Sequence, residues 1–179
     1  MLPRFAHERT GEVADFVRAC PLPVILPLLI PGLERNCFER PDRFGVTTLT
    51  GVEALCHYFR RLGYTRLALL GPDEPSDPLL QARLSAYTCF THRAGLEATF
   101  GLIPASAEAA DALATRWQQW CGNLAIISYD DTHALRLMTA MHKLGRSAPT
   151  DFAILGFNNI EASLTSDPPL STVCQDYDY

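Results

Sequence analysis

The segment from Lys143 to Asn159 constrains the fold more than any other part of this chain of 179 residues. Gly145 can adopt the left-handed conformation that ends a helix, and Pro149 prevents a helix from restarting. The run from Phe152 to Leu155 is apolar, too short for a helix and bounded by breakers, which is typical of a buried strand. The polar pair Asn158-Asn159 follows at the carboxyl end of that strand. Because ligands of open parallel α/β sheets bind at such ends, this segment predicts both a fold class and a place for a ligand.

The same order of helix, turn and strand recurs along the chain. Amphipathic patterns predict helices over Gly51–Leu62, Pro78–Ala94, Ala107–Trp120 and Asp131–Leu144. Short apolar runs predict strands over Pro23–Leu26, Gly45–Thr48, Leu67–Leu70, Phe100–Ile103, Leu124–Ile127, Phe152–Leu155 and Ser171–Val173. Since strands and helices alternate from residue 45 onward, we predict an α/β fold with a parallel sheet sandwiched by helices.

Composition excludes several classes of function. The formal net charge of −5 offers no overall basic surface for nucleic acid. The six cysteines are scattered, without a CxxC pair or a histidine cluster, so we expect neither a metal site nor a disulfide scaffold. The first residues lack the sustained apolar stretch of a signal peptide, and the apolar run from Pro21 to Ile30 is too short to span a bilayer. These features predict a cytoplasmic protein without membrane contact.

Polar side chains follow two of the predicted strands. Asp130 and Asp131 stand between a strand and a helix, where an aspartate is a favoured helix cap, and capping is the first interpretation. Asn158 follows another strand, where asparagine is favoured in turns. The carboxyl ends of parallel strands lie at one edge of the sheet. The competing interpretation is therefore that Asp130 and Asn158, which follow two of these ends, both contact a ligand. Arg83 lies near the start of a helix that faces the same edge, and it is either a solvated charge or a hydrogen-bonding fork for a ligand.

The sequence gives no positive indication of catalysis. No serine lies in a glycine-flanked elbow, no histidine belongs to a recognisable triad, and neither GxGxxG nor a phosphate-loop motif occurs. We therefore predict that the chain is not an enzyme and requires no cofactor.

Six motifs occur in the order found in the effector-binding domain of the LacI/GalR transcription factors, over residues from about 45 to 177. They are Gly51–Gly71 with its helix, Leu-Gly turn and strand, Ala82–Tyr87, Gly95-Leu96, Asp130-Asp131-x-x-Ala134, Pro149–Asn159 and the Pro-Pro-Leu-Ser-Thr-Val run Pro168–Val173. Each motif is weak alone, but six in order make the chain resemble that family over most of its length.

The resemblance implies a site for a small effector, often a sugar or nucleobase. By that resemblance the effector-contacting positions are Arg83, Asp130, Asn158, Gln175 and Tyr177. Asp130 stands where the family usually has asparagine, and Asn158 where it usually has aspartate. This exchange preserves the number of donors and acceptors while changing which effector fits. The family's aromatic platform is replaced by the run Pro104-Ala105-Ser106.

The resemblance also implies an organisation into periplasmic-binding-protein-like lobes. We expect residues 1–65 to be a partial N-terminal lobe, 66–174 a nearly complete C-terminal effector-binding lobe, and 175–179 the final crossover. The helix-turn-helix of the family has no counterpart in this sequence, so operator DNA would be bound only through an N-terminal domain outside it, in a full-length homodimer. The alternatives are a periplasmic sugar-binding protein of an ABC transporter, and an enzyme of flavodoxin-like architecture.

Overall fold

The computed structural model describes residues 24–26, 43–45 and 48–173, and the side chains from residue 51 onward. Strands β1 (Val24–Leu26) and β2 (Arg43–Gly45) pair in parallel with each other. The other strands of the described residues form one five-stranded parallel sheet in the order β4-β3-β5-β6-β7. They are β3 (Arg66–Pro72), β4 (Thr99–Ile103), β5 (Leu124–Ser128), β6 (Ala153–Phe157) and β7 (Thr172–Val173).

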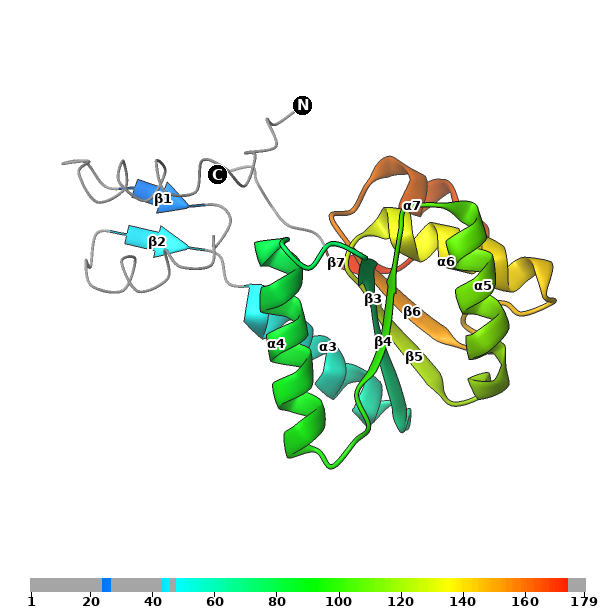
Figure 1. Ribbon diagram of the computed structural model, residues 1–179, viewed down its shortest axis with the longest axis horizontal. Coiled ribbons are helices and arrows are strands. Elements are labelled where there is room, and N and C mark those ends of the chain that lie inside the picture. Colours follow the sequence, from blue (N-terminus) through cyan, green and yellow to red (C-terminus); the bar gives the residue numbers. More distant parts are fainter. Residues whose placement is uncertain (1–23, 27–42, 46–47, 174–179) are drawn as a thin grey trace.

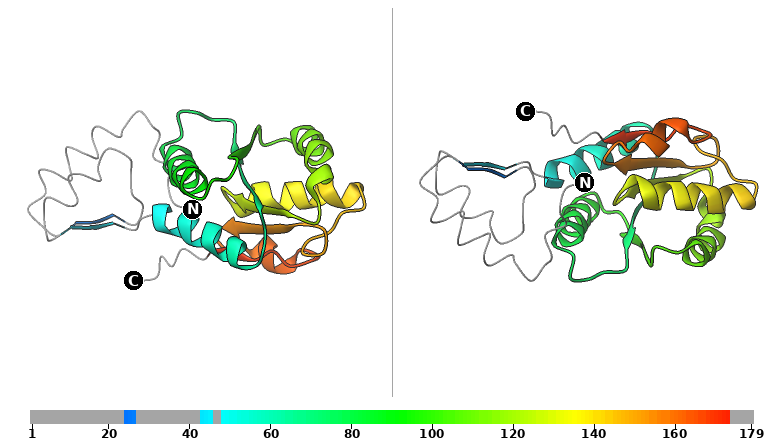
Figure 2. Two further views of the ribbon diagram at one scale, coloured as in Figure 1. Left: turned by 90° about the horizontal axis from the view of Figure 1, so that it is seen from below. Right: turned by 90° about the horizontal axis from the view of Figure 1, so that it is seen from above.

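Helices cover both faces of this sheet. The helices are α3 (Thr48–Arg61), α4 (Pro78–Arg93), α5 (Ala107–Trp117), α6 (Asp131–Lys143) and α7 (Glu161–Thr165). Figures 1 and 2 show α3 and α4 on one face and α5 and α6 on the other. This arrangement confirms the predicted α/β class with a helix-covered parallel sheet.

Alternating side chains of the central strands form two hydrophobic cores. In β3, Leu67 and Leu69 pack toward α3 and α4, whereas Ala68 and Leu70 pack toward α5 and α6. Strands that are buried on both faces consist of nearly continuous apolar residues, which explains why they are recognisable as short apolar runs. In this packing, the N-terminal ends of the helices lie at the same edge of the sheet as the carboxyl ends of the strands.

The helix end in the segment Lys143–Asn159 forms as predicted. Helix α6 ends at Lys143, and Gly145 follows with φ +71° and donates its N–H to the carbonyl of His142 at 2.9 Å. Glycine tolerates this left-handed conformation without a Cβ penalty. The chain then enters β6 between β5 and β7, so this segment supplies one of the inner strands of the sheet.

The limits of several predicted elements differ from the structure, and in two of them the type of element changes as well. The run Gly45–Thr48 was expected to be one strand, but β2 ends at Gly45 and Thr48 is the first residue of α3. The β preference of threonine is weak, and packing of the apolar face of α3 on the sheet outweighs it. The predicted helix Ala107–Trp120 leaves α-helical geometry after Trp117 and continues as a 3₁₀ turn over Gln118–Trp120. Tight turns of this kind are common at helix ends.

Candidate functional site

The order of the strands creates a switch point between β3 and β5. Strand β3 leads into α4 on one face of the sheet, while its neighbour β5 leads into α6 on the other face. Connections that leave adjacent strands toward opposite faces open a crevice at the carboxyl ends, where ligands of such sheets bind. The loops after β3, β5 and β6 therefore form the candidate site.

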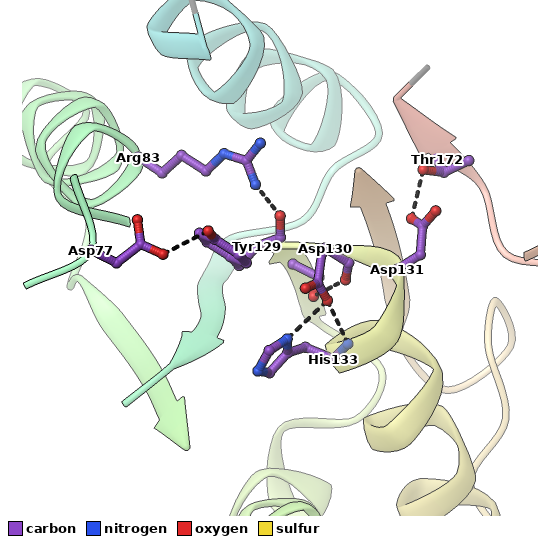
Figure 3. Close-up of polar contacts among 8 residues, drawn as sticks. Asp77, Arg83, Tyr129, Asp130, Asp131, His133 and Thr172 are labelled. Carbon is purple, nitrogen blue, oxygen red and sulfur yellow. Dashed lines mark hydrogen bonds and ion pairs between the residues drawn. The ribbon is translucent and has the colours of Figure 1, made fainter. Parts of the chain in front are cut away.

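Arg83 lies in the interior and not on the surface. Its side chain extends from the second turn of α4 and is 1% exposed. The guanidinium donates to the carbonyl of Tyr129, as Figure 3 shows, and its central carbon lies 4.0 Å from the ring centre of Phe157 and 5.0 Å from that of Tyr129. A cation over aromatic faces is stabilised electrostatically, more so when water is excluded. Arg83 therefore joins α4 to the carboxyl ends of β5 and β6.

Asp77 and Tyr129 connect the loop after β3 with the loop after β5. One carboxylate oxygen of Asp77, Oδ1, accepts from the N–H groups of Leu79 and Leu80 at 2.7 and 3.1 Å and so caps α4. The other, Oδ2, accepts from the hydroxyl of Tyr129 at 2.7 Å (Figure 3). Burial, followed by this hydrogen bond to Asp77, raises the pKa of Tyr129 well above its ordinary value. The tyrosine remains a neutral donor at physiological pH.

Asp130 caps α6 and is held by His133. Its Oδ1 accepts from the backbone N–H of His133 at 2.7 Å and lies 2.8 Å from Nδ1 of the same residue (Figure 3). Burial raises the pKa of Asp130, but the hydrogen bonds from the His133 ring and backbone outweigh burial and hold it below the ordinary value. Asp130 is therefore a half-buried carboxylate at neutral pH, and the predicted capping role is confirmed.

Asp131 is a fully buried carboxylate that links the end of β5, by hydrogen bonds, to the segments around β6 and β7. Its Oδ2 accepts from the N–H of Ile160 at 3.0 Å, and its Oδ1 accepts from the Thr172 hydroxyl at 2.6 Å. Gly156 makes room for it, because a Cβ at that position would overlap Asp131 Oδ1. Sequence reasoning recognised the Asp130-Asp131 pair but gave the binding role only to Asp130, and it missed Asp77 and Tyr129. The available signals were the position of Asp77 just before Pro78 and that of Tyr129 directly after a strand.

Asn158 occupies the tip after β6, in the turn conformation that its residue type predicts. Its φ is +97°, and its backbone N–H donates to the carbonyl of Val173 at 3.0 Å. Asn159 follows with φ +52° and donates its N–H to the Thr172 hydroxyl at 3.3 Å. Both side chains are exposed at the edge of the sheet. Thr172 thus links this tip to Asp131.

The structure brings three of the five predicted contact residues to one edge. Arg83 lies beneath this edge, Asp130 follows β5, and Asn158 follows β6. Gln175 and Tyr177 lie outside the described residues. Among residues 51–173, no group of three or more metal-ligating side chains converges, and no described helix is long and apolar enough to cross a membrane.

Comparison with known proteins places this architecture in a family. The model of the periplasmic binding protein-like domain matches residues 56–178. The HTH-type transcriptional repressor CytR of Escherichia coli K12 is 27% identical over 135 residues, which are 73% of this chain and 39% of that protein. The chain therefore spans less than half the length of this relative.

Two solved structures share the fold. One is the Lac repressor dimer bound to operator and the anti-inducer ONPF, with a TM-score of 0.62 and 24% identity over 75% of this chain and 41% of that chain. The other is a periplasmic binding protein/LacI transcriptional regulator from Alkaliphilus metalliredigens complexed with D-xylulofuranose, with a TM-score of 0.61 and 17% identity over 74% of this chain and 50% of that one. The chain belongs to the periplasmic binding protein-like domain family, in the form found in LacI/GalR-type transcriptional regulators.

Proposed function

We propose that this chain is the effector-sensing part of a LacI-type, DNA-binding transcriptional regulator that acts in the cytoplasm. The observation that carries the proposal is the buried Arg83, which joins the ends of β5 and β6 at the switch point of the sheet. An effector that contacts this edge meets a preorganised surface, because the polar tips around it are already fixed by hydrogen bonds. Asp130 and Asn158 supply the direct contacts, and Gln175 and Tyr177 of the final crossover complete them.

The chain is divided accordingly into residues 1–65, a partial N-terminal lobe, 66–174, the C-terminal effector-binding lobe, and 175–179, the final crossover. In the intact homodimer, effector binding favours one arrangement of the two lobes. Operator affinity then changes only by the difference in effector affinity between the two arrangements. Related structures that contain operator, an anti-inducer or a sugar support this assignment.

A transport function is the weaker alternative. Solute-binding proteins of transporters share the two-lobe fold, but the curated relatives of this chain are transcriptional repressors and regulators. These relatives favour regulation over transport and over enzymatic activity. No described residue gives a specific reason to prefer either alternative.

The proposal is tested by measuring the operator affinity of the intact regulator with and without candidate effectors. An authentic effector is expected to change operator affinity by about 5- to 150-fold, the usual range of allosteric coupling. Arg83→Lys keeps the positive charge but loses the planar guanidinium with its paired N–H donors. We therefore expect it to weaken the change in operator affinity that the effector causes. An operator affinity that no small molecule alters would contradict the proposal.

A further inference from the structure

We infer that the effector group meeting the edge formed by the loops after β3, β5 and β6 is uncharged and hydroxyl-bearing, and that this edge rejects a phosphate ester. The inference rests on the proposed function, because it concerns the ligand of the same site. It follows from the capping of the helix N-termini by carboxylates and from the charge at this edge.

The helix ends that could hold a phosphate are already occupied. Phosphate groups bind at helix N-termini because free backbone N–H groups and the positive end of the helix dipole point at them. Asp77 accepts from the first free N–H groups of α4, and Asp130 accepts from an N–H in the first turn of α6. A phosphate at either helix would have to displace a carboxylate that the same chain supplies.

The charge near this edge is also unfavourable for an anion. Asp130 is ionised at neutral pH because its hydrogen bonds to His133 favour the charged form. The positive charge of Arg83 acts on this edge and helps to lower the pKa of Asp130, but the guanidinium is 1% exposed and donates to the carbonyl of Tyr129, so it is not presented to a ligand as an exposed cation. A phosphate would therefore meet the carboxylate of Asp130 before any exposed cation of the described residues that form this edge.

The remaining hydrogen-bonding capacity suits hydroxyl groups. Within the described residues, the hydrogen bonds to Asp130 all end on Oδ1, which leaves Oδ2 as an acceptor at the edge. The exposed amide of Asn158 offers both a donor and an acceptor. A hydroxyl can donate to the carboxylate and also accept from the amide, whereas a phosphate dianion can only accept. The edge is thus matched to a polyol such as a free sugar.

The test compares sugars with their own phosphate esters. Isothermal titration of the full chain and of the intact regulator would use D-ribose with D-ribose 5-phosphate and D-glucose with D-glucose 6-phosphate. At least one free sugar is expected to bind, and its ester is expected to bind about tenfold or more weakly, as repulsion by one nearby carboxylate predicts. Asp130→Asn keeps a residue that caps helices well and removes the charge, so it is expected to reduce this preference about fivefold.

Glu97→Gln is the matched control. It also removes one negative charge, but Glu97 lies just before β4 at the opposite edge of the sheet, where it pairs with Arg66 at 3.7 Å. The preference for free sugar is expected to remain unchanged in this variant. Equal change in both variants would show that overall charge, and not Asp130, sets the preference, and would overturn the inference.

Two further outcomes separate the inference from the proposed function. If the phosphate esters bind as tightly as the free sugars, or if only other compounds bind and change operator affinity, the inference is wrong and the proposed function stands. If no compound of any class changes operator affinity in the intact regulator, the proposed function fails and the inference fails with it.

Discussion

Arg83 combines a structural role in the interior with the proposed role in effector binding. Its charge lies in the interior, over the rings of Tyr129 and Phe157, and its hydrogen bond satisfies the carbonyl of Tyr129. Removing one partner of a buried polar contact leaves the other unsatisfied, which costs more than the contact itself contributes. A loss of effector binding in an Arg83 variant therefore has to be separated from a loss of folding.

We expect Arg83→Ala to lower the free energy of unfolding by about 2 to 4 kcal/mol, because it leaves a cavity and an unsatisfied carbonyl. Urea unfolding of the full chain measures this change. Arg93→Ala on the same helix is the control, since Arg93 pairs with Glu53 on the surface and its loss is expected to cost less than about 1 kcal/mol. Equal losses in the two variants would show that burial of Arg83 contributes nothing.

Asp130 predicts a particular dependence of stability on pH. The pKa of Asp130 in the folded chain lies below its ordinary value of 3.8, so its ionised form stabilises the fold. This contribution is complete above the unfolded pKa and is lost as the pH falls through the lower, folded pKa. We therefore expect the stability difference between the wild type and Asp130→Asn to be largest above about pH 4 to 5 and to shrink in stronger acid. Thermal unfolding between pH 2 and 7 measures it, and a difference that grows in acid would contradict the assignment.

At the scale of elements, Asp131 and Gly156 link the start of α6 to the ends of β6 and β7. The Asp131 carboxylate accepts from the N–H of Ile160, just before α7, and from the hydroxyl of Thr172 in β7, and glycine is required at position 156, where the chain passes closest to it. The loop after β6 that carries Asn158 is therefore held in place by Asp131, at the start of α6. Since Thr172 in β7 is one of the donors, the same contact fixes the chain just before the final crossover.

Gly156→Ala is expected to destabilise the chain by about 1 to 3 kcal/mol, because the added methyl group overlaps the Asp131 carboxylate. Gly51→Ala is the matched control. Its Cβ would make only an ordinary contact with the Phe157 ring at 3.6 Å, and alanine is favoured over glycine within a helix such as α3. Gly51→Ala should therefore leave stability unchanged or raise it by up to about 1 kcal/mol. Chemical denaturation of both variants distinguishes a steric effect at Gly156 from a general response to added methyl groups.

At the scale of the whole molecule, effector sensing and operator binding are expected to belong to different parts of the regulator. The chain has a formal net charge of −5, whereas binding to the DNA backbone depends on clustered lysine and arginine. The fold instead places the carboxylates of Asp77 and Asp130 and the exposed amide of Asn158 at the carboxyl ends of the strands. Under the proposed function, an effector would then change operator affinity without contacting the DNA.

We expect the 179-residue chain by itself to form no specific complex with operator DNA. A gel-shift assay at physiological salt, with the intact regulator as the positive control, tests this expectation. A retained complex that competes with specific but not with random DNA would show that this chain carries operator-binding residues.

The local pattern of the sequence determined most of the elements, though not all of their limits, and the positions of the polar residues that follow β5 and β6. Buried strands appear as apolar runs, Asp130 has the residue type of a helix cap, and Asn158 has that of a turn; all three depend on neighbours within a few residues. The domain limits and the contact roles of Gln175 and Tyr177 remain predictions.

Only the tertiary structure decided the strand order, the burial of Arg83 and the role of Asp131. Arg83 donates to a carbonyl 46 residues away, and Asp131 accepts from groups 29 and 41 residues further along the chain. No periodicity or propensity encodes such distant pairings, because they arise when parallel strands bring their carboxyl ends to one edge. The sequence by itself therefore determined where polar groups occur, and the packing of the sheet decided which of them meet.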